Sequence, residues 1–266
     1  MSRLKDKVVI VTGSTSGIGT GIAQICAKEG ASVVVTGRRQ EKGQAVVDDI
    51  VSKGGKASFC YLDITKEDSI VELINFTKKT YGKIDVLVNN AANVSLKDGR
   101  ITDLTAQMWD DIFSSDMRSV FLATKYVIPH MQENGRGSIV NIGSMASCGG
   151  DLGATAYASA KAGVDMLTKS TAMQYGKDNI RCNCVRPGLI VTPDNEEKVP
   201  EFVKSVFLNN IEVNRYGCPE DIANMVVFFA SEESEFVTSQ IITVDGGMNR
   251  HVTTVGEFKR ANSKTW

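Results

Sequence analysis

The sequence of 266 residues contains only two histidines and five prolines, and none of its six cysteines forms a Cys-x-x-Cys pair. With so few ligands at suitable spacing, we expect no zinc or other metal site. The sequence also lacks a run of about 18 apolar residues, and residues 1–7 lead directly into a predicted strand. We therefore expect neither a membrane span nor a signal peptide.

An excess of charge of one sign is missing as well, because 30 basic and 31 acidic residues leave a formal net charge of −1. Such a balance favours neither a nucleic-acid partner nor a membrane surface. Hydrophobic residues make up 42% of the chain and charged residues 23%, which is typical of a soluble globular protein with a large core. We expect a cytoplasmic protein whose cysteines are buried, reduced thiols.

Seven short runs rich in valine and isoleucine alternate with longer amphipathic stretches. The runs are nearly continuous in apolar residues, which is typical of strands buried on both faces of a parallel sheet. The alternation predicts an α/β fold, a doubly wound (Rossmann) parallel sheet of about seven strands with helices on both faces. The predicted strands are Val8–Thr12, Ser32–Thr36, Ala57–Leu62, Val86–Val88, Ser138–Ile142, Arg181–Val185 and Ile241–Val244.

No linker rich in proline or serine divides the sequence, so we expect residues 1–266 to form a single dinucleotide-binding and catalytic domain. Residues 189–215 contain no predicted strand and carry prolines and several charges, which predicts a helical excursion or lid. Residues 248–266 follow the last strand as a polar tail ending in Trp266. A solvent-exposed terminus is the simpler interpretation of this tail, and a contact with a subunit or the substrate is the alternative.

A glycine-rich turn, Thr12–Gly19, follows the first predicted strand and opens a helix. Glycines at positions 13, 17 and 19 let the backbone turn tightly and approach a ligand. The following helix directs its N–H groups and the positive end of its dipole toward a pyrophosphate. The spacing is G-x-x-x-G-x-G rather than the commoner G-x-G-x-x-G. Its position inside a β–α–β unit predicts a dinucleotide site, with an ordinary tight loop as the alternative.

The end of the second predicted strand favours NADP(H) over NAD(H). An NAD-binding unit usually places Asp or Glu there to hold the ribose 2′-hydroxyl, whereas this sequence has Arg38 and Arg39. Two guanidiniums can pair with a 2′-phosphate, although exposed arginines after a strand are often only solvated. Asp63, after the third strand, is predicted to meet the adenine edge, and a helix N-cap is its alternative role.

Tyr157 and Lys161 lie four residues apart in a predicted helix, so the phenol and the ammonium share one helix face. A free phenol has a pKa of about 10, and a neighbouring ammonium stabilises the phenolate. The pair can therefore exchange a proton with an alcohol or ketone oxygen. Ser144, after the fifth predicted strand, can hydrogen-bond the same oxygen. A lone Tyr-x-x-x-Lys pattern usually lies on the surface and has no catalytic role, so the prediction depends on the other motifs found with it.

Together these motifs resemble the short-chain dehydrogenases/reductases over essentially the whole chain, from about residue 5 to residue 247. The motifs that carry the resemblance, in order, are Thr12–Gly19, Asn89-Asn90-Ala91, Ser144, Tyr157 with Lys161, and Pro187-Gly188 with Thr192. The resemblance implies that Ser144, Tyr157 and Lys161 are catalytic. It also implies that Lys161 holds the cofactor ribose, that the protein is a homotetramer built through long helices, and that its substrate is a small alcohol or ketone.

The resemblance further implies that Asn90 shapes the cofactor floor and that Ile190 and Thr192 meet the nicotinamide amide. The full set of predicted cofactor-binding residues is Gly13, Ser14, Ser16, Gly17, Ile18, Gly19, Arg38, Arg39, Asp63, Ile64, Asn90, Ala91, Tyr157, Lys161, Pro187, Gly188, Ile190 and Thr192.

Two positions depart from the family pattern. Ala92 stands where the family has the glycine of Asn-Asn-Ala-Gly, a modest change if the backbone there needs no positive φ. Asp116 stands where the family often has an asparagine that supports a proton relay to the lysine, so it joins the predicted catalytic residues. A carboxylate there is either a harmless near-isostere, or it stabilises the Lys161 ammonium and shifts the pH optimum or abolishes turnover.

The candidate substrate pocket comprises Asn93–Leu96, Met145–Leu152 and residues 189–215. Its apolar residues favour a bulky hydrophobic ketone, although they can equally form the core of a lid. They are Met145, Leu152, Val199, Phe202 and Phe207.

Segments such as Ile128–Met131, Asn179–Asn183 and Pro219–Asn224 resemble the bacterial bile-acid hydroxysteroid dehydrogenases, which implies a 7α- or 12α-hydroxysteroid substrate. The alternatives are a 3-oxoacyl thioester, a sugar alcohol, and a nucleotide-binding sensor or scaffold that has lost turnover through Asp116.

Overall fold

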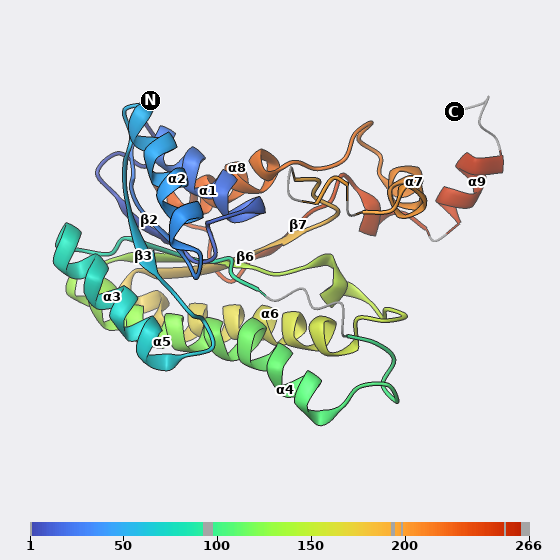
Figure 1. Cartoon of the computed structure of the whole chain (residues 1–266), viewed down its shortest axis with the longest axis horizontal. Coiled ribbons are helices and arrows are strands. Elements are labelled where there is room, and N and C mark those ends of the chain that lie inside the picture. Colours follow the sequence, from blue (N-terminus) through green and yellow to red (C-terminus); the bar gives the residue numbers. More distant parts are fainter. Residues whose placement is uncertain (1, 93–97, 193–194, 198, 253, 262–266) are drawn as a thin grey trace.

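Seven parallel strands form one sheet in the order β3-β2-β1-β4-β5-β6-β7 (Figure 1). The computed structural model describes residues 2–92, 98–192, 195–197, 199–252 and 254–261. The strands are β1 (Val8–Val11), β2 (Ser32–Gly37), β3 (Lys56–Tyr61), β4 (Val86–Asn89), β5 (Gly137–Ile142), β6 (Ile180–Pro187) and β7 (Ile241–Val244). Each overlaps one predicted run, so the predicted fold class is confirmed.

The strand order reverses at β1, which pairs with β2 on one side and with β4 on the other. Val9, for example, lies opposite Val33 of β2 and Val86 of β4. In a doubly wound sheet the loops leave the two neighbouring strands in opposite directions at such a point, and a crevice opens at their carboxyl ends. The fold therefore places a ligand crevice beyond the ends of β1 and β4.

Helices cover both faces of the sheet (Figure 1). Helices α1, α2 and α8 pack on one face, and α3, α5 and α6 pack on the other. Val9 and Val11 of β1 belong to the first core and Ile10 to the second, because alternate residues of a strand face opposite sides. The helices are α1 (Gly17–Lys28), α2 (Gln40–Ser52), α3 (Glu67–Tyr81), α4 (Ala106–Phe113), α5 (Ser119–Glu133), α6 (Thr155–Tyr175), α7 (Glu201–Asn210), α8 (Pro219–Ala230) and α9 (Val255–Ala261).

The predicted lid and tail lie together at the end of the molecule opposite α3 (Figure 1). Helix α7 lies within residues 189–215, and Ile190 forms an isolated bridge with Gly217. The tail contains α9 and contacts the lid segment, since the Lys259 ammonium pairs with the Glu212 carboxylate at 3.0 Å. Part of the tail thus lies against the lid segment, and Trp266 lies outside the described residues.

The cysteine prediction is only partly correct. All six cysteines are free, and Cys26, Cys182 and Cys184 are buried. Burial raises the pKa of the Cys26 thiol to about 12. Cys60 and Cys218 are half-buried, however, and Cys148 is exposed. Cys148 is exposed because it ends a short 3₁₀ turn on the surface, Met145–Cys148, rather than a strand. In the described part of the chain, no helix has the length and apolar character that a membrane span needs.

Candidate active site

The predicted site residues come together at the carboxyl edge of the sheet. Gly13 follows β1, Asn90 follows β4, Ser144 follows β5 and Gly188 follows β6. Because parallel strands all end at the same edge, residues far apart in the sequence line one crevice. The strand order reverses at this edge between β1 and β4, where such a crevice is expected.

The glycine-rich turn needs its glycines. Gly13 and Gly17 have φ of 65° and 59°, and such left-handed conformations are strained for other residues. A Cβ on Gly13 would lie 2.8 Å from the Ala91 Cα, and one on Gly19 would lie 2.4 Å from the Gly13 carbonyl oxygen. The Asn90 amide Nδ2 donates to the carbonyl oxygens of Thr12 and Gly13, at 2.8 and 3.2 Å. Asn90 and Ala91 thus hold the turn in place.

The two serines of the turn have different roles. Ser14 is fully buried, and its Oγ donates to the Val11 carbonyl and accepts the Thr36 N–H. Its hydroxyl therefore ties β1 to β2. Its backbone N–H also donates to the Thr36 carbonyl oxygen at 2.9 Å, so Ser14 stabilises the turn. Ser16 immediately precedes α1, and its Oγ accepts a hydrogen bond from Arg39 Nη2 at 3.0 Å. Ile18 and Ile64 are half-buried and pack against the two cores.

Arg38 and Arg39 are both exposed just beyond the end of β2. The contact with Ser16 places the Arg39 guanidinium beside the glycine turn. Asp63 accepts hydrogen bonds from the Thr65 hydroxyl and backbone N–H, at 2.7 and 3.0 Å. The Thr65 hydroxyl bond, with a smaller contribution from the Arg38 charge, lowers the Asp63 pKa. The alternative N-cap role is wrong, because Lys66 occupies the N-cap of α3.

Tyr157 and Lys161 face the same side of α6, and the Lys161 Nζ lies 5.6 Å from the centroid of the Tyr157 ring. Lys161 is 2% exposed, and its Nζ donates to the Ile142 carbonyl oxygen at 3.0 Å. Ser144 is half-buried at the start of the turn that follows β5, and its Oγ accepts the Ala146 N–H at 3.1 Å. The structure therefore gathers the predicted catalytic residues at one end of α6.

Asp116 joins this group from a π-helical turn, Ser114–Arg118, between α4 and α5. Such turns insert an extra residue into a helix and often mark functional sites. The carboxyl is fully buried, its Oδ1 lies 3.9 Å from Lys161 Nζ, and its Oδ2 accepts the Ser115 hydroxyl at 2.5 Å. Gly163 allows α6 to approach this turn, since a Cβ there would lie 3.0 Å from the Met117 sulfur.

The segment after β6 closes the other side of the crevice. A Cβ on Gly188 would lie 2.7 Å from the Asp245 Cβ, so this position lets β6 and the end of β7 stay close after Pro187. Ile190 and Thr192 are both buried. A Cβ at Gly17 would lie 3.9 Å from the Thr192 methyl group, so the segment reaches back to the glycine turn.

Comparison with known proteins decides the family. A family model described as enoyl-(acyl carrier protein) reductase matches residues 13–249. A 7α-hydroxysteroid dehydrogenase of Clostridium sardiniense is 41% identical, with 93% of this chain and 95% of the relative covered. A 3-oxoacyl-(acyl-carrier-protein) reductase of Thermotoga maritima is 38% identical, with 92% and 99% covered. This chain is a short-chain dehydrogenase/reductase.

A solved structure supports the same conclusion. A 7α-hydroxysteroid dehydrogenase complexed with NADH and 7-oxo glycochenodeoxycholic acid has a TM-score of 0.88 and 36% identity, covering 92% of this chain and 95% of that one. As a short-chain dehydrogenase/reductase the chain is an oxidoreductase of a family that uses a nicotinamide cofactor. The relatives act on different substrates, so the family alone leaves the substrate open.

Two features of this short-chain dehydrogenase/reductase were missed in the sequence. Asn89 Nδ2 donates to Asn141 Oδ1 and Asn141 Nδ2 to Thr168 Oγ1, each at 2.9 Å, which links β4, β5 and α6 below the site. Asn141 lies inside a buried strand, and a buried amide needs hydrogen-bond partners. A polar residue in this apolar run could therefore have indicated the network from the sequence. The second feature is Asp98, whose carboxylate accepts the backbone N–H of Tyr157 at 2.8 Å.

The predicted substrate pocket is partly described. Leu152 and Phe202 are 95% and 76% exposed, so they do not form the core of a lid. Met145, Val199 and Phe207 are half-buried, and Asn93–Leu96 lies outside the described residues.

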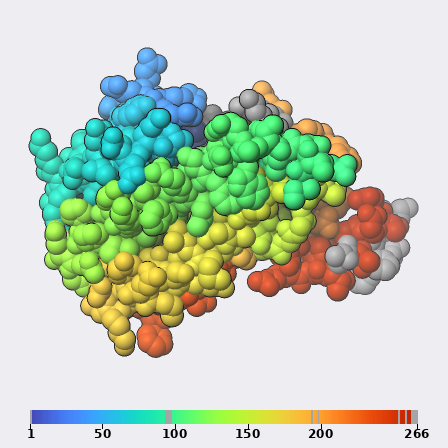
Figure 2. Space-filling model, turned by 90° about the horizontal axis from the view of Figure 1, so that it is seen from below, coloured from blue at the N-terminus to red at the C-terminus, as the bar shows by residue number. Residues whose placement is uncertain are grey.

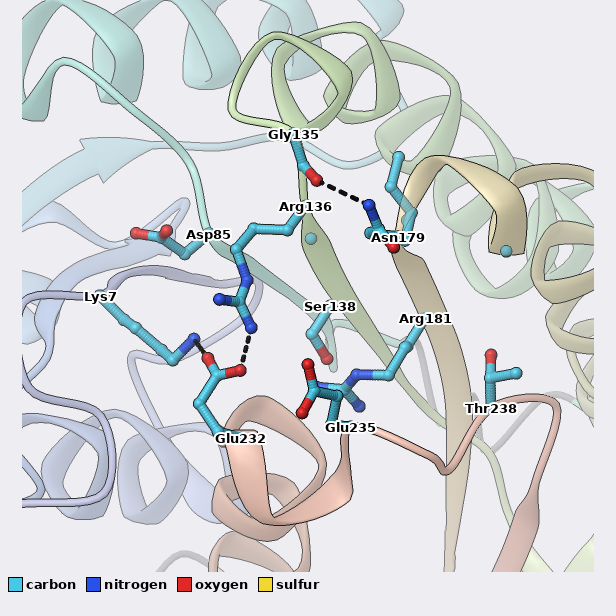
Figure 3. A pocket seen from close by; sticks show the side chains of 13 residues that line it. Lys7, Asp85, Gly135, Arg136, Ser138, Asn179, Arg181, Glu232, Glu235 and Thr238 are labelled. Atoms are coloured by element: carbon cyan, nitrogen blue, oxygen red, sulfur yellow. Dashed lines mark hydrogen bonds and ion pairs between the residues drawn. The ribbon is translucent and has the colours of Figure 1, made fainter.

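A separate cavity of about 350 Å³ lies at the opposite, amino edge of the sheet (Figure 3). No predicted site residue lines it. Glu232 pairs there with both Lys7 and Arg136, across the chain segments that enter β1 and β5. These ion pairs tie the segment after α8 to the sheet, far from the predicted chemistry.

Proposed function

We propose that this enzyme interconverts a secondary alcohol and a ketone with NADP(H), and that its substrate is a bile-acid hydroxysteroid, with the 7α-hydroxyl as the reacting group and the 12α-hydroxyl as the alternative. The observation that carries the reaction class is the buried Lys161 ammonium, 5.6 Å from the Tyr157 ring and 3.9 Å from the Asp116 carboxylate. A phenol held beside a buried cation is suited to exchange a proton with an alcohol or ketone oxygen.

Each side chain has a defined part in the proposed reaction. Tyr157 takes the hydroxyl proton when an alcohol is oxidised and returns it when a ketone is reduced. Ser144 Oγ already accepts the Ala146 N–H, which leaves its own proton to donate to the substrate oxygen. Lys161 stabilises the phenolate by its charge, and the Ile142 carbonyl and Asp116 hold that charge in place. A bound nicotinamide supplies or accepts the hydride.

The glycine turn fits a dinucleotide. Gly13 and Gly19 let the turn pack tightly against Ala91 and Asn90, and the turn opens α1, where the helix dipole favours a pyrophosphate. Ile190 and Thr192 are proposed to meet the nicotinamide amide, and Lys161 the ribose. Arg38 and Arg39 favour NADP(H), because no carboxylate ends β2 and Arg39 already reaches the turn. The related structure was solved with NADH, so this preference needs its own test.

The bile-acid substrate is supported by the hydroxysteroid relatives and by two exposed apolar side chains, Leu152 and Phe202, on the predicted pocket segments. A steroid presents a large apolar surface that such residues can cover. A 3-oxoacyl thioester reductase is the second candidate, because the Thermotoga maritima relative is nearly as similar.

We also propose a homotetramer assembled through the long helices α5 and α6. Figure 2 shows their outer faces side by side, in green and yellow. Phe121 of α5 is 46% exposed, and Met166 and Met173 of α6 are 60% and 68% exposed. Exposed apolar side chains on the outer helices favour association where they form one patch. Light scattering on the purified protein should give four times the 28.8 kDa chain mass; a monomer would refute this assembly.

A substrate panel tests the proposed activity. Bile acids with 7α-, 7β- or 12α-hydroxyls, a sugar alcohol and a short 3-hydroxyacyl thioester are each supplied with NADP⁺ or NAD⁺, and reduced nicotinamide is followed by absorbance. We expect the highest kcat/KM for a 7α-hydroxysteroid with NADP⁺. A higher value for the thioester would favour the second candidate. Tight NADPH binding without turnover on any member would favour a sensor or scaffold that has lost activity.

A further inference from the structure

Helix α6 lacks a local cap at its amino end, although it carries Tyr157 in its first turn. Ala154 stands at the N-cap position, makes no side-chain hydrogen bond, and is followed by no acidic residue in the first turn. The first four N–H groups of any helix have no acceptor inside the helix, and alanine is a poor cap. This end therefore depends on water or on groups from elsewhere in the chain.

Asp98, on the segment between β4 and α4, provides that cap from 59 residues away. Its Oδ2 accepts the Tyr157 N–H at 2.8 Å, and its Oδ1 accepts the Ala156 N–H at 3.2 Å. The adjacent Gly99 carbonyl accepts the Thr155 hydroxyl at 2.7 Å. Asp98 and Gly99 thus contact three consecutive residues of the first turn.

Resting on the function proposed above, we infer that Asp98 is a positioning residue that fixes Tyr157 in its reactive place. The bond is made to the backbone N–H of the reacting tyrosine itself. The Lys161 end of the pair is separately held by the Ile142 carbonyl, on β5. Asp98 therefore sets the position of the phenol against a lysine that stays fixed to the sheet.

The charge of Asp98 has a second consequence. A carboxylate near the start of α6 interacts favourably with the helix dipole, but it also opposes the formation of a negative phenolate on the same turn. Lys161 acts in the opposite direction. Removal of the Asp98 charge should therefore make the phenolate easier to form, while loss of the hydrogen bonds makes its position less defined.

Two variants separate these effects. Asp98→Asn keeps one acceptor oxygen but places an NH₂ group against a second N–H donor, and Asp98→Ala removes both acceptors. Asp103→Asn is the matched control, because Asp103 is an exposed carboxylate on the same segment. We expect kcat to fall by about 10- to 100-fold in Asp98→Ala, as for a misplaced catalytic group, and by less in Asp98→Asn. The KM for NADP⁺ should stay within about twofold, because the glycine turn is untouched.

The pH profile gives the readout that a merely structural role would not move. In Asp98→Asn the acidic limb of kcat for alcohol oxidation should shift to lower pH, and it should not shift in Asp103→Asn. Amide hydrogen exchange at Ala156 and Tyr157, which needs no turnover, should be faster in both Asp98 variants. Folded Asp98 variants with wild-type kcat, pH profile and exchange would overturn the inference.

Tyr157→Phe distinguishes failure of the proposed function from failure of the inference on Asp98. If this variant retains wild-type turnover, the proposed function fails, and the exchange experiment alone decides whether Asp98 holds the first turn. If it loses turnover while the Asp98 variants behave as wild type, only the inference on Asp98 fails.

Discussion

Asp116 stands where the family often has an asparagine, and it is either a harmless near-isostere or a charge that acts on Lys161. Replacement of Asp116 by asparagine decides between these two interpretations. The Asp116 Oδ1 and the Lys161 Nζ lie 3.9 Å apart, and both side chains are almost fully buried, at 0% and 2% exposure. At an effective dielectric constant of about 20, two unit charges at this distance attract each other by about 4 kcal/mol. An asparagine side chain would retain a polar group of the same shape but no charge.

We expect Asp116→Asn to lower the free energy of unfolding at pH 7 by about 1–4 kcal/mol, less than the full attraction where the amide and water compensate. The Lys161 ammonium keeps its charge while a neighbouring negative charge is removed, so the phenolate should form more easily. The acidic limb of kcat for alcohol oxidation should therefore move to lower pH.

Urea unfolding at pH 7 and steady-state kinetics over a series of pH values measure both effects. Asp110→Asn is the control, because Asp110 is an exposed carboxylate on the neighbouring α4. The reasoning is refuted if Asp116→Asn matches the wild type in stability and in pH profile. In that case the carboxylate is a harmless near-isostere.

Three further results are expected. Replacing Arg38 and Arg39 together by alanine should remove charge-assisted hydrogen bonds to the 2′-phosphate, which are worth about 1.5–3 kcal/mol. The value of kcat/KM should therefore fall by about 10- to 150-fold with NADP⁺ and little with NAD⁺. Equal losses with the two cofactors would argue against selection of NADP(H). Gly13→Ala forces a side chain into a left-handed turn, at 2.8 Å from a neighbouring backbone atom, and calorimetry should show NADPH affinity reduced at least about 10-fold. The Arg215 hydrogen bond lowers the Asp221 pKa, so its stabilisation is present above the ordinary carboxyl pKa and is lost as the pH falls through the lowered one. Urea unfolding should therefore find Arg215→Met less stable than wild type at pH 7 and equal to it in strong acid.

The sheet and the glycine turn were predictable because their signals are local. A continuous Val/Ile run indicates a strand buried on both faces, whichever strands it pairs with. Gly13 and Gly17 are required by backbone geometry, since both have positive φ, whereas Gly19 is required by its close approach to the Gly13 carbonyl oxygen and to Asn90. The pairing of Tyr157 with Lys161 followed from the helical repeat in the same way.

Other parts of the site depend on contacts that no local pattern contains. The Ser14 hydroxyl binds β2 rather than facing a ligand, which follows only from how β1 and β2 pair. Asp98 caps a helix 59 residues further along the chain. The π-helical turn around Asp116 is invisible to a helical hydrophobic pattern, because its extra residue changes the register over a single turn.

The exposure of Cys148 is another example. Free cysteine is usually a buried residue type, so the sequence favours burial of Cys148. Its exposure results from the short turn that Ser144 caps, which the sequence pattern does not reveal.

The central claim is that Tyr157 exchanges the proton with the substrate beside Lys161, and Tyr157→Phe tests it most directly. The phenylalanine keeps the ring that packs near the Lys161 ammonium and removes only the hydroxyl. The variant should bind NADPH within about threefold of wild type while kcat for a 7α-hydroxysteroid falls by about 10²- to 10⁴-fold, the range that general acid–base groups contribute. Wild-type turnover in this variant, with binding intact, would contradict the account.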